Sequence, residues 1–105
     1  MEKSQIDQFW KEGYVVVESV VPWELIQEAN IVLKQLVEDA CKVTSSNSIY
    51  DLSDQHTERV PNVRRIKDPH LVHPVYDHIM RSEALLDCIG ALLGTDLRME
   101  HSKLN

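Results

Sequence analysis

The chain has 105 residues, of which 43% are hydrophobic and 27% are charged, as in ordinary globular domains. Its formal net charge of -6 argues against a nucleic-acid binder, because such proteins carry a basic surplus. No apolar stretch approaches the roughly 20 residues of a membrane-spanning helix, and no secretory signal is visible at the start.

The two cysteines, Cys41 and Cys88, each lie within an apolar pattern of helical spacing. This placement favours buried free thiols in a reducing compartment over a disulfide framework. We therefore expect a cytoplasmic protein that binds neither membrane nor nucleic acid; the sequence leaves its oligomeric state open.

The first third of the chain predicts a helix, a strand and a second helix. Ser4 is a candidate helix cap, and Gly13 a candidate stop after an apolar face made by Ile6, Phe9 and Trp10. Residues 14–17, Tyr-Val-Val-Val, predict a strand buried on both faces. Pro22 then begins an amphipathic helix of about five turns. We expect Trp10 and Trp23 to pack in the core or between helices.

The remainder alternates loops and short elements. Residues 44–61 form a long loop without periodicity, and residues 62–67 predict a short strand that ends at Asp68-Pro69. Helices are expected from His73-Pro74 and from Ser82, the latter ending at Gly94. Residues 97–102 alternate apolar and polar side chains, as a half-exposed strand would.

These elements predict an α+β fold with more helix than sheet. The valine-rich strand and the strand at the end of the chain need neighbours, because buried unpaired backbone groups are costly. We therefore expect residues 1–105 to be the amino-terminal part of one domain, with its sheet completed beyond Asn105. A small helical domain with a minor sheet is the alternative on patterning alone.

Several segments together resemble the phytanoyl-CoA dioxygenase family. They are FWKEGYVVV at residues 9–17 with Val21-Pro22 opening a long helix, RRIKDP at 64–69, IGALLGTDLR at 89–98 and HSKLN at 101–105. The resemblance covers nearly the whole chain and is weakest in the loop at residues 44–60. It implies the first helices and strands of a double-stranded β-helix, or jelly roll, incomplete in this chain.

The resemblance also implies an enzyme that uses iron(II) and 2-oxoglutarate to hydroxylate a small organic molecule. The iron ligands of this family, a His-x-Asp pair and a distant His, leave positions open for 2-oxoglutarate and oxygen. They are expected beyond Asn105. The 105-residue chain alone is therefore predicted to be inactive, although its loop at 44–61 is a candidate substrate lid.

By the same resemblance, Lys67 and Lys103 are candidate contacts for 2-oxoglutarate. A cation suits a dicarboxylate electrostatically. Arg65 is an alternative to Lys67, because the alignment contains a one-residue shift, and Asn105 is a weaker candidate for the same pocket. Where relatives have methionine at the position of Lys103, this chain departs from the family. The simpler interpretation of both lysines is a solvated surface residue.

The histidines are also candidate metal ligands. His56-Thr57-Glu58 has the spacing of two ligands of a facial triad, but it lies in an irregular loop. His73 and His78 are five apart, which does not align them on one helical face. Loop hydrogen bonds and helix caps explain these histidines more simply, so no metal site is predicted within the chain.

The rival hypothesis is a non-catalytic helical interaction module with an acidic surface. In that case the helix at residues 22–41 would pack against a partner helix or a second copy. An in-frame His-x-Asp motif downstream of Asn105 would favour the enzyme, whereas a natural stop and independent cooperative folding would favour the module.

Overall fold

The computed structural model describes all of residues 1–105 and contains helices and one small sheet. The elements in chain order are α1 (Lys3–Glu12), α2 (Trp23–Asp39), a 3₁₀ turn (Ala40–Lys42), β1 (Tyr50–Leu52), β2 (Val63–Lys67), α3 (Pro69–Val72), α4 (Pro74–Met80), α5 (Glu83–Leu93) and β3 (Lys103–Leu104). This mixture of helices with an antiparallel sheet confirms the α+β class.

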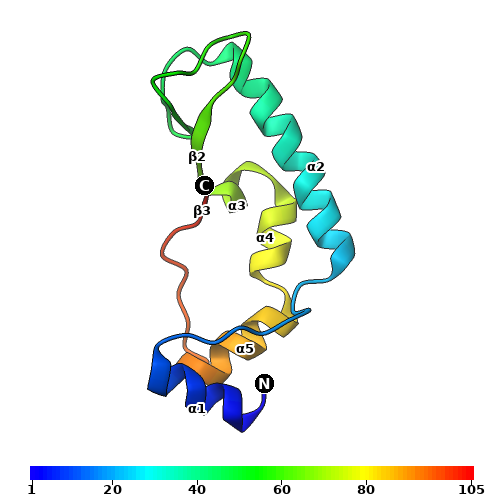
Figure 1. Cartoon of the computed structure of the whole chain (residues 1–105). Helices are drawn as coiled ribbons and strands as arrows, with labels where there is room; N and C mark the ends of the chain where they lie inside the picture. The colour runs from blue at the N-terminus through cyan, green and yellow to red at the C-terminus, as the bar shows by residue number, and fades with distance from the viewer.

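The molecule is elongated, with extents of 50 × 27 × 23 Å (Figure 1). Its radius of gyration is 16.7 Å, against about 13 Å for a compact domain of this size. The sheet lies near one end, α1 packs against α5 at the other, and α2 packs along α4 between them (Figure 1). Only 6 of the 105 residues are buried, so the elements do not share one central core.

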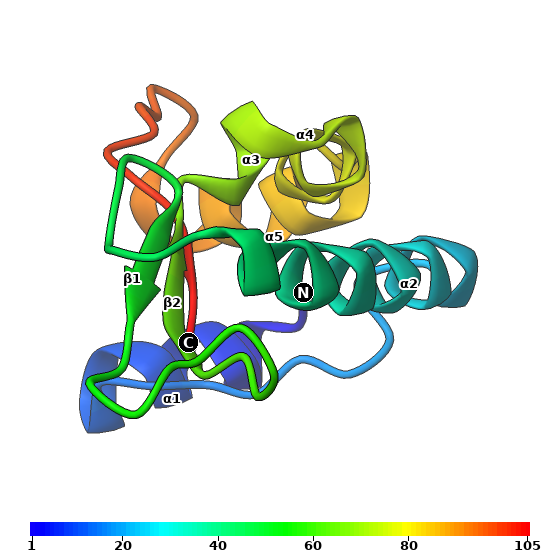
Figure 2. The ribbon, with the colours of Figure 1, turned by 90° about the horizontal axis from the view of Figure 1, so that it is seen from above.

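The sheet has three antiparallel strands in the order β1-β2-β3. On one side of β2, Tyr50 is opposite Ile66, and the register shifts by a bulge between Asp51 and Leu52. On the other side, β3 runs beside β2 (Figure 2) and pairs through two residues. The central strand β2 therefore brings together the loop that precedes it and the segment at the end of the chain.

Two tyrosine hydroxyls fasten α2 to the rest of the molecule. Tyr50 donates to the carbonyl of Leu36 at 2.6 Å, and Tyr76 donates to the carbonyl of Ala29 at 2.8 Å. Burial raises the pKa of both phenols, and the carboxylate of Asp39 adds to the increase in the pKa of Tyr50. Tyr50 also packs in the small core between α2 and the sheet, which consists of Ala40, Tyr50 and Ile66.

The helix boundaries largely follow the predicted signals. Gly13 ends α1 with a left-handed φ of 85°, and the side chain of His73 accepts the amide of Val75 to cap α4. The expected cap at Ser4 is wrong, because Glu2 is the N-cap and forms a capping box with Gln5. Ser82 does precede α5, but its buried hydroxyl makes no capping bond.

The strand predicted at residues 14–17 is wrong. This segment is irregular, with Tyr14 59% and Val16 72% exposed. No neighbouring strand lies beside it, so β propensity alone has no ladder to join. Conversely, the predicted loop at 44–61 contains β1, because pairing with β2 gives its residues backbone partners. The strand expected at 97–102 is irregular, and pairing begins only at Lys103.

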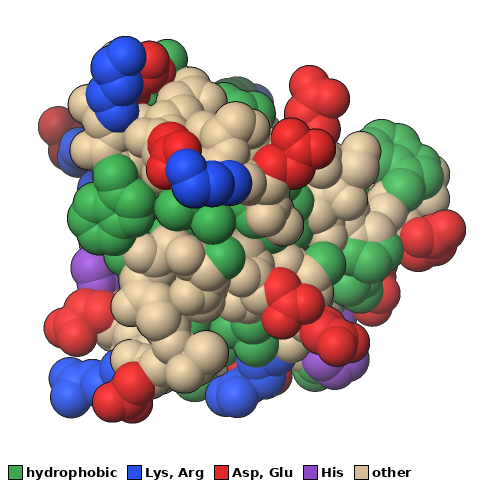
Figure 3. All heavy atoms as spheres, turned by 90° about the horizontal axis from the view of Figure 1, so that it is seen from below, with side chains coloured by type: hydrophobic (Ala, Val, Ile, Leu, Met, Phe, Trp, Pro, Cys, Tyr) green, Lys and Arg blue, Asp and Glu red, His purple; other side chains and the backbone are tan.

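Many large apolar side chains are exposed. Trp10 is 67% and Trp23 64% exposed, so neither packs in the core, which was one of the two placements predicted for them. The end of the molecule that carries α1 and α5 shows hydrophobic side chains between acidic ones (Figure 3). No helix of the structure combines the length and apolar character required to cross a bilayer.

Candidate functional site

The two predicted ligand-binding lysines lie directly opposite each other in the sheet. Lys67 on β2 is the register partner of Lys103 on β3. Side chains of directly opposed residues project from the same face of an antiparallel pair. The structure therefore brings these residues together, although the two positions are far apart in the sequence.

The backbone hydrogen bonds around this pair show that the backbones of the two lysines lie close together. The amide of Lys67 donates to the carbonyl of Ile49 at 2.7 Å, on the β1 side, and so points away from β3. The next pair, Asp68 and Ser102, is joined by a backbone bond of 2.9 Å. Since bonded and non-bonded pairs alternate, Lys67 and Lys103 form a non-bonded pair, the kind with the shorter separation of about 4.5 Å between Cα atoms.

The two secondary candidates lie on the same face. Arg65 and Asn105 are each two residues from a lysine of the pair, and side chains two apart share a face of a strand. Nε of Arg65 donates to Oδ1 of Asn105 at 3.3 Å. Arg65, Lys67, Lys103 and Asn105 thus form one row across β2 and β3, here called the basic row. Arg65 and Lys67 on β2 are half-buried, whereas Lys103 on β3 and Asn105, just after β3, are exposed.

Lys67 is held by the loop that precedes β1. Its Nζ donates to the carbonyl oxygen of Asn47 at 2.8 Å. The side chain of Asn47 in turn accepts the amides of Ile49 and Tyr50, each at 2.8 Å, which fixes the turn that presents this carbonyl. An ammonium has three N–H donors, so this one bond leaves two for a ligand.

No acidic side chain forms an ion pair that would neutralise the positive charges of the basic row. The three ion pairs of the structure, Lys3–Asp7, Arg81–Asp77 and Arg98–Glu100, all lie elsewhere. Asp51 is the register partner of Arg65 on β1 but does not form an ion pair with it. Like charges placed directly opposite each other are destabilising in a sheet. A bound dianion would relieve this repulsion, so the row is suited to a dicarboxylate.

Three of the five histidines, His56, His70 and His73, make side-chain hydrogen bonds. His56 donates through Nε2 to the carbonyl of Val43 at 2.9 Å and accepts the amide of Asn62 on Nδ1 at 2.9 Å, on the tautomer that satisfies both contacts. These bonds join the two ends of the loop at 44–61. No three His, Cys, Asp or Glu side chains come together in a way that would hold a metal ion.

Sequence reasoning identified the members of the basic row but missed the residues that support it. Asn47 is expected from the sequence only as part of a polar loop, and the roles of Asp68, His70 and Ser102 were not foreseen. The signal for Asn47 is its position in a serine-rich turn, where an Asx turn is common. Asp68 and His70 lie just after the end of β2, on either side of Pro69, and Ser102 directly precedes β3. Their roles become visible only when β3 is seen to pair with β2.

Comparison with known proteins finds a relative that is similar along the whole chain. The chain is 30% identical over 105 residues to a protein of Stutzerimonas stutzeri described as a probable alpha-ketoglutarate-dependent hypophosphite dioxygenase. Alpha-ketoglutarate is another name for 2-oxoglutarate. The match covers 100% of this chain but only 37% of that protein. No protein-family model matches the chain, and no solved structure matches it.

Proposed function

We propose that this chain is the amino-terminal part of an iron(II)/2-oxoglutarate-dependent dioxygenase of the phytanoyl-CoA dioxygenase type. The observation that carries the proposal is the direct opposition of Lys67 and Lys103 on one face of the sheet. Similarity over the full 105 residues to a protein described as a probable alpha-ketoglutarate-dependent dioxygenase independently supports the 2-oxoglutarate-dependent class. The phytanoyl-CoA dioxygenase type rests on the resemblance noted in the sequence. In this proposal the basic row forms one edge of the 2-oxoglutarate site.

The chemistry of the row matches that co-substrate. 2-Oxoglutarate carries two carboxylates, and charge-assisted bonds from ammonium groups are among the stronger hydrogen bonds in proteins. Lys67 is half-buried, which weakens the competition from solvent, whereas Lys103 is more exposed and supplies a second cation at the rim. The amide side chain of Asn105 and the guanidinium of Arg65 extend the set of polar groups on the same face.

The residues of this chain do not fit the iron centre. Such a centre needs two histidines and a carboxylate arranged on one face of the metal. The side chains of residues 1–105 provide no such group. The proposal therefore places the iron ligands, and the jelly roll that carries them, in polypeptide outside these residues. The exposed apolar side chains of α1 and of residues 14–17 are proposed to pack against it.

The proposed substrate is a small molecule that accepts an oxygen atom. The resemblance noted in the sequence suggests an aliphatic C–H bond in an organic compound. The name of the Stutzerimonas stutzeri relative instead specifies hypophosphite, an inorganic anion. Hypophosphite is therefore the first compound to assay with the longer polypeptide, followed by organic acids.

Calorimetric titration of the 105-residue chain with 2-oxoglutarate tests the proposed site. We expect saturable binding that weakens by about tenfold or more in Lys67→Met and in Lys103→Met, the loss expected for a charge-assisted bond. Lys34→Met is the matched control, because Lys34 is a lysine on α2 away from the row. Equal affinities in all four proteins, or no binding by the wild type, would reject the proposal.

A second candidate function is the helical interaction module. It is favoured by the exposure of Ile31, 71%, and Trp23, 64%, on α2. Sedimentation analysis of the chain with and without Ile31→Glu tests this candidate. Self-association that the substitution abolishes would support a second copy as the partner, whereas a monomer at all concentrations would exclude a second copy as the partner.

A further inference from the structure

The last strand is held in place by few ladder contacts. β3 contains only Lys103 and Leu104, and each pairs with one residue of β2. One of these pairs places two lysines opposite each other, and like charges at opposed positions destabilise a strand pair. A strand this short with a repulsive pair needs support from outside the ladder. The residues immediately before it provide that support.

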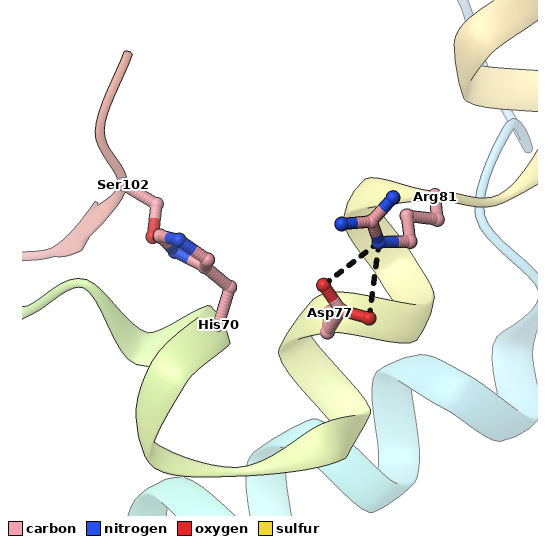
Figure 4. A network of polar contacts seen from close by, with 4 residues as sticks. All are labelled: His70, Asp77, Arg81 and Ser102. Carbon is pink, nitrogen blue, oxygen red and sulfur yellow. Dashed lines mark hydrogen bonds and ion pairs between the residues drawn. The ribbon is translucent and has the colours of Figure 1, made fainter. Parts of the chain in front are cut away.

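Three hydrogen bonds fix Ser102, the residue before β3. Its carbonyl accepts the amide of Asp68 at 2.9 Å, and its own amide donates to Oδ1 of Asp68 at 3.1 Å. Its hydroxyl is 2.6 Å from Nδ1 of His70 on α3. Figure 4 shows the imidazole of His70 and the side chain of Ser102 directed toward each other, while Asp77 on α4 and Arg81, just after that helix, form a separate pair.

The backbone at Asp68 makes this arrangement possible. Asp68 has a left-handed conformation, with φ 45° and ψ 56°, which residues other than glycine seldom adopt. The conformation turns the chain from β2 into α3 and places His70 on the side of Ser102. Aspartate tolerates it better than most residues. The same residue therefore ends β2 and bonds both backbone groups of Ser102.

We propose that Asp68, His70 and Ser102 form a clamp that positions Lys103 opposite Lys67 before any ligand arrives. The three residues are half-buried and touch neither lysine's ammonium group, so they act as positioning residues. The clamp offsets the repulsion between the lysines and keeps both cations on one face. That the ligand is 2-oxoglutarate rests on the proposed function; the clamp itself rests on these contacts.

Amide hydrogen exchange measured by NMR on the 105-residue chain tests the clamp without a ligand. The probe is the amide of Asp68, which bonds the carbonyl of Ser102. Ser102→Ala should speed its exchange by about tenfold, the factor that one net hydrogen bond supplies. His70→Ala should have the same effect. Exchange in the double variant should be no faster than in either single variant, because both substitutions remove the same contact between His70 and Ser102.

The charge on Lys103 supplies the decisive variant. In Ser102→Ala, adding Lys103→Met should restore slow exchange at Asp68, because the repulsion that opens the weakened pair is gone. In the wild type, Lys103→Met should change this exchange little. His101→Ala is the matched control, because His101 is exposed on the same segment and makes no hydrogen bond to Asp68 or His70.

Affinity for 2-oxoglutarate separates the clamp from the proposed function. Binding by the wild type, with about tenfold weaker binding by Ser102→Ala, supports both. If the wild type does not bind but Ser102→Ala still speeds exchange and Lys103→Met reverses it, the clamp stands and the proposed function fails. If Ser102→Ala and His70→Ala leave the exchange of Asp68 unchanged, the clamp is overturned whatever the affinity.

Discussion

The ammonium group of Lys67 donates a hydrogen bond of 2.8 Å to the backbone carbonyl of Asn47, which lies in the loop before β1. The carbonyl is presented by a turn that the Asn47 side chain closes through the amides of Ile49 and Tyr50. The loop at residues 44–48 thereby sets the direction of a cation that lies on a different strand.

Asn47→Ala is predicted to weaken 2-oxoglutarate binding several-fold, because loss of the turn frees Lys67 to adopt other rotamers. Asn47→Asp should retain most of the affinity, since an aspartate oxygen can accept the same two amides. Calorimetric titration of the two variants, with thermal unfolding measured in parallel, checks the result. Identical affinities in Ala and Asp variants of equal stability would contradict this role.

Stability is predicted to fall at alkaline pH through Tyr50 and Tyr76. The pKa of each phenol is raised in the folded state, so folding favours the protonated form. This contribution is complete below the unfolded pKa of about 10 and is lost as the pH rises through and beyond that value. Urea unfolding at about pH 8 and about pH 11 should show the decrease.

Phenylalanine variants identify the source of that decrease. Tyr50→Phe and Tyr76→Phe should each flatten the alkaline loss, and each should cost about 1 kcal/mol near neutral pH because a hydrogen bond is removed. Tyr14→Phe, at an exposed position, serves as the control. An alkaline decrease that persists unchanged in the Tyr50→Phe/Tyr76→Phe double variant would show that other groups cause it.

Two glycines are predicted to respond in opposite ways to alanine. Gly13 has φ +85° with open space where a Cβ atom would lie, so Gly13→Ala should lower the free energy of unfolding by about 1 kcal/mol through backbone strain alone. Gly90 lies inside α5, where alanine has the better helix propensity, and a Cβ atom there would lie 3.9 Å from Thr95 Cγ2. Gly90→Ala should therefore raise the free energy by roughly 0.5–1 kcal/mol.

Urea denaturation of both glycine variants beside the wild type provides the measurement. The two substitutions add the same methyl group, so an opposite sign isolates the conformational effect. A Gly13→Ala variant that is as stable as the wild type, or more stable, would refute the left-handed end of α1.

The 105-residue chain is predicted not to consume 2-oxoglutarate, because it brings no three metal-ligating side chains together. The assay is succinate formation with iron(II), ascorbate and oxygen, compared with a reaction without protein. Succinate production above that background, abolished by Lys67→Met, would contradict the assignment of the iron ligands to other polypeptide.

Local signals in the sequence predicted four of the five α-helices, but the short helix α3 at Pro69–Val72 was not predicted. The apolar spacing of α2 and the stops at Gly13 and Gly94 depend on residues within one or two turns, so they can be found without knowing the fold. The strands were harder to predict. The most β-prone run, residues 14–17, has no partner in the structure, whereas β1 forms in a polar loop because β2 lies beside it.

The candidate site shows the same difference between local signals, which the sequence reveals, and pairing between distant segments, which it does not. Lys67, Lys103, Arg65 and Asn105 were each identifiable as candidates, the lysines through a family resemblance. Their common face depends on the register of β3 against β2, which joins residues that are distant in the chain. Asp68, His70 and Ser102 set that register through contacts that have no periodic or compositional signal.

The most direct test of the proposed site is an NMR titration of the isotope-labelled chain with 2-oxoglutarate. We predict saturable shifts confined to residues 47–50, 65–68 and 102–105, the three segments that meet at the basic row. Saturable shifts centred instead on the polar cavity lined by Cys41, Thr44 and His56, or no saturable shifts at all, would contradict it.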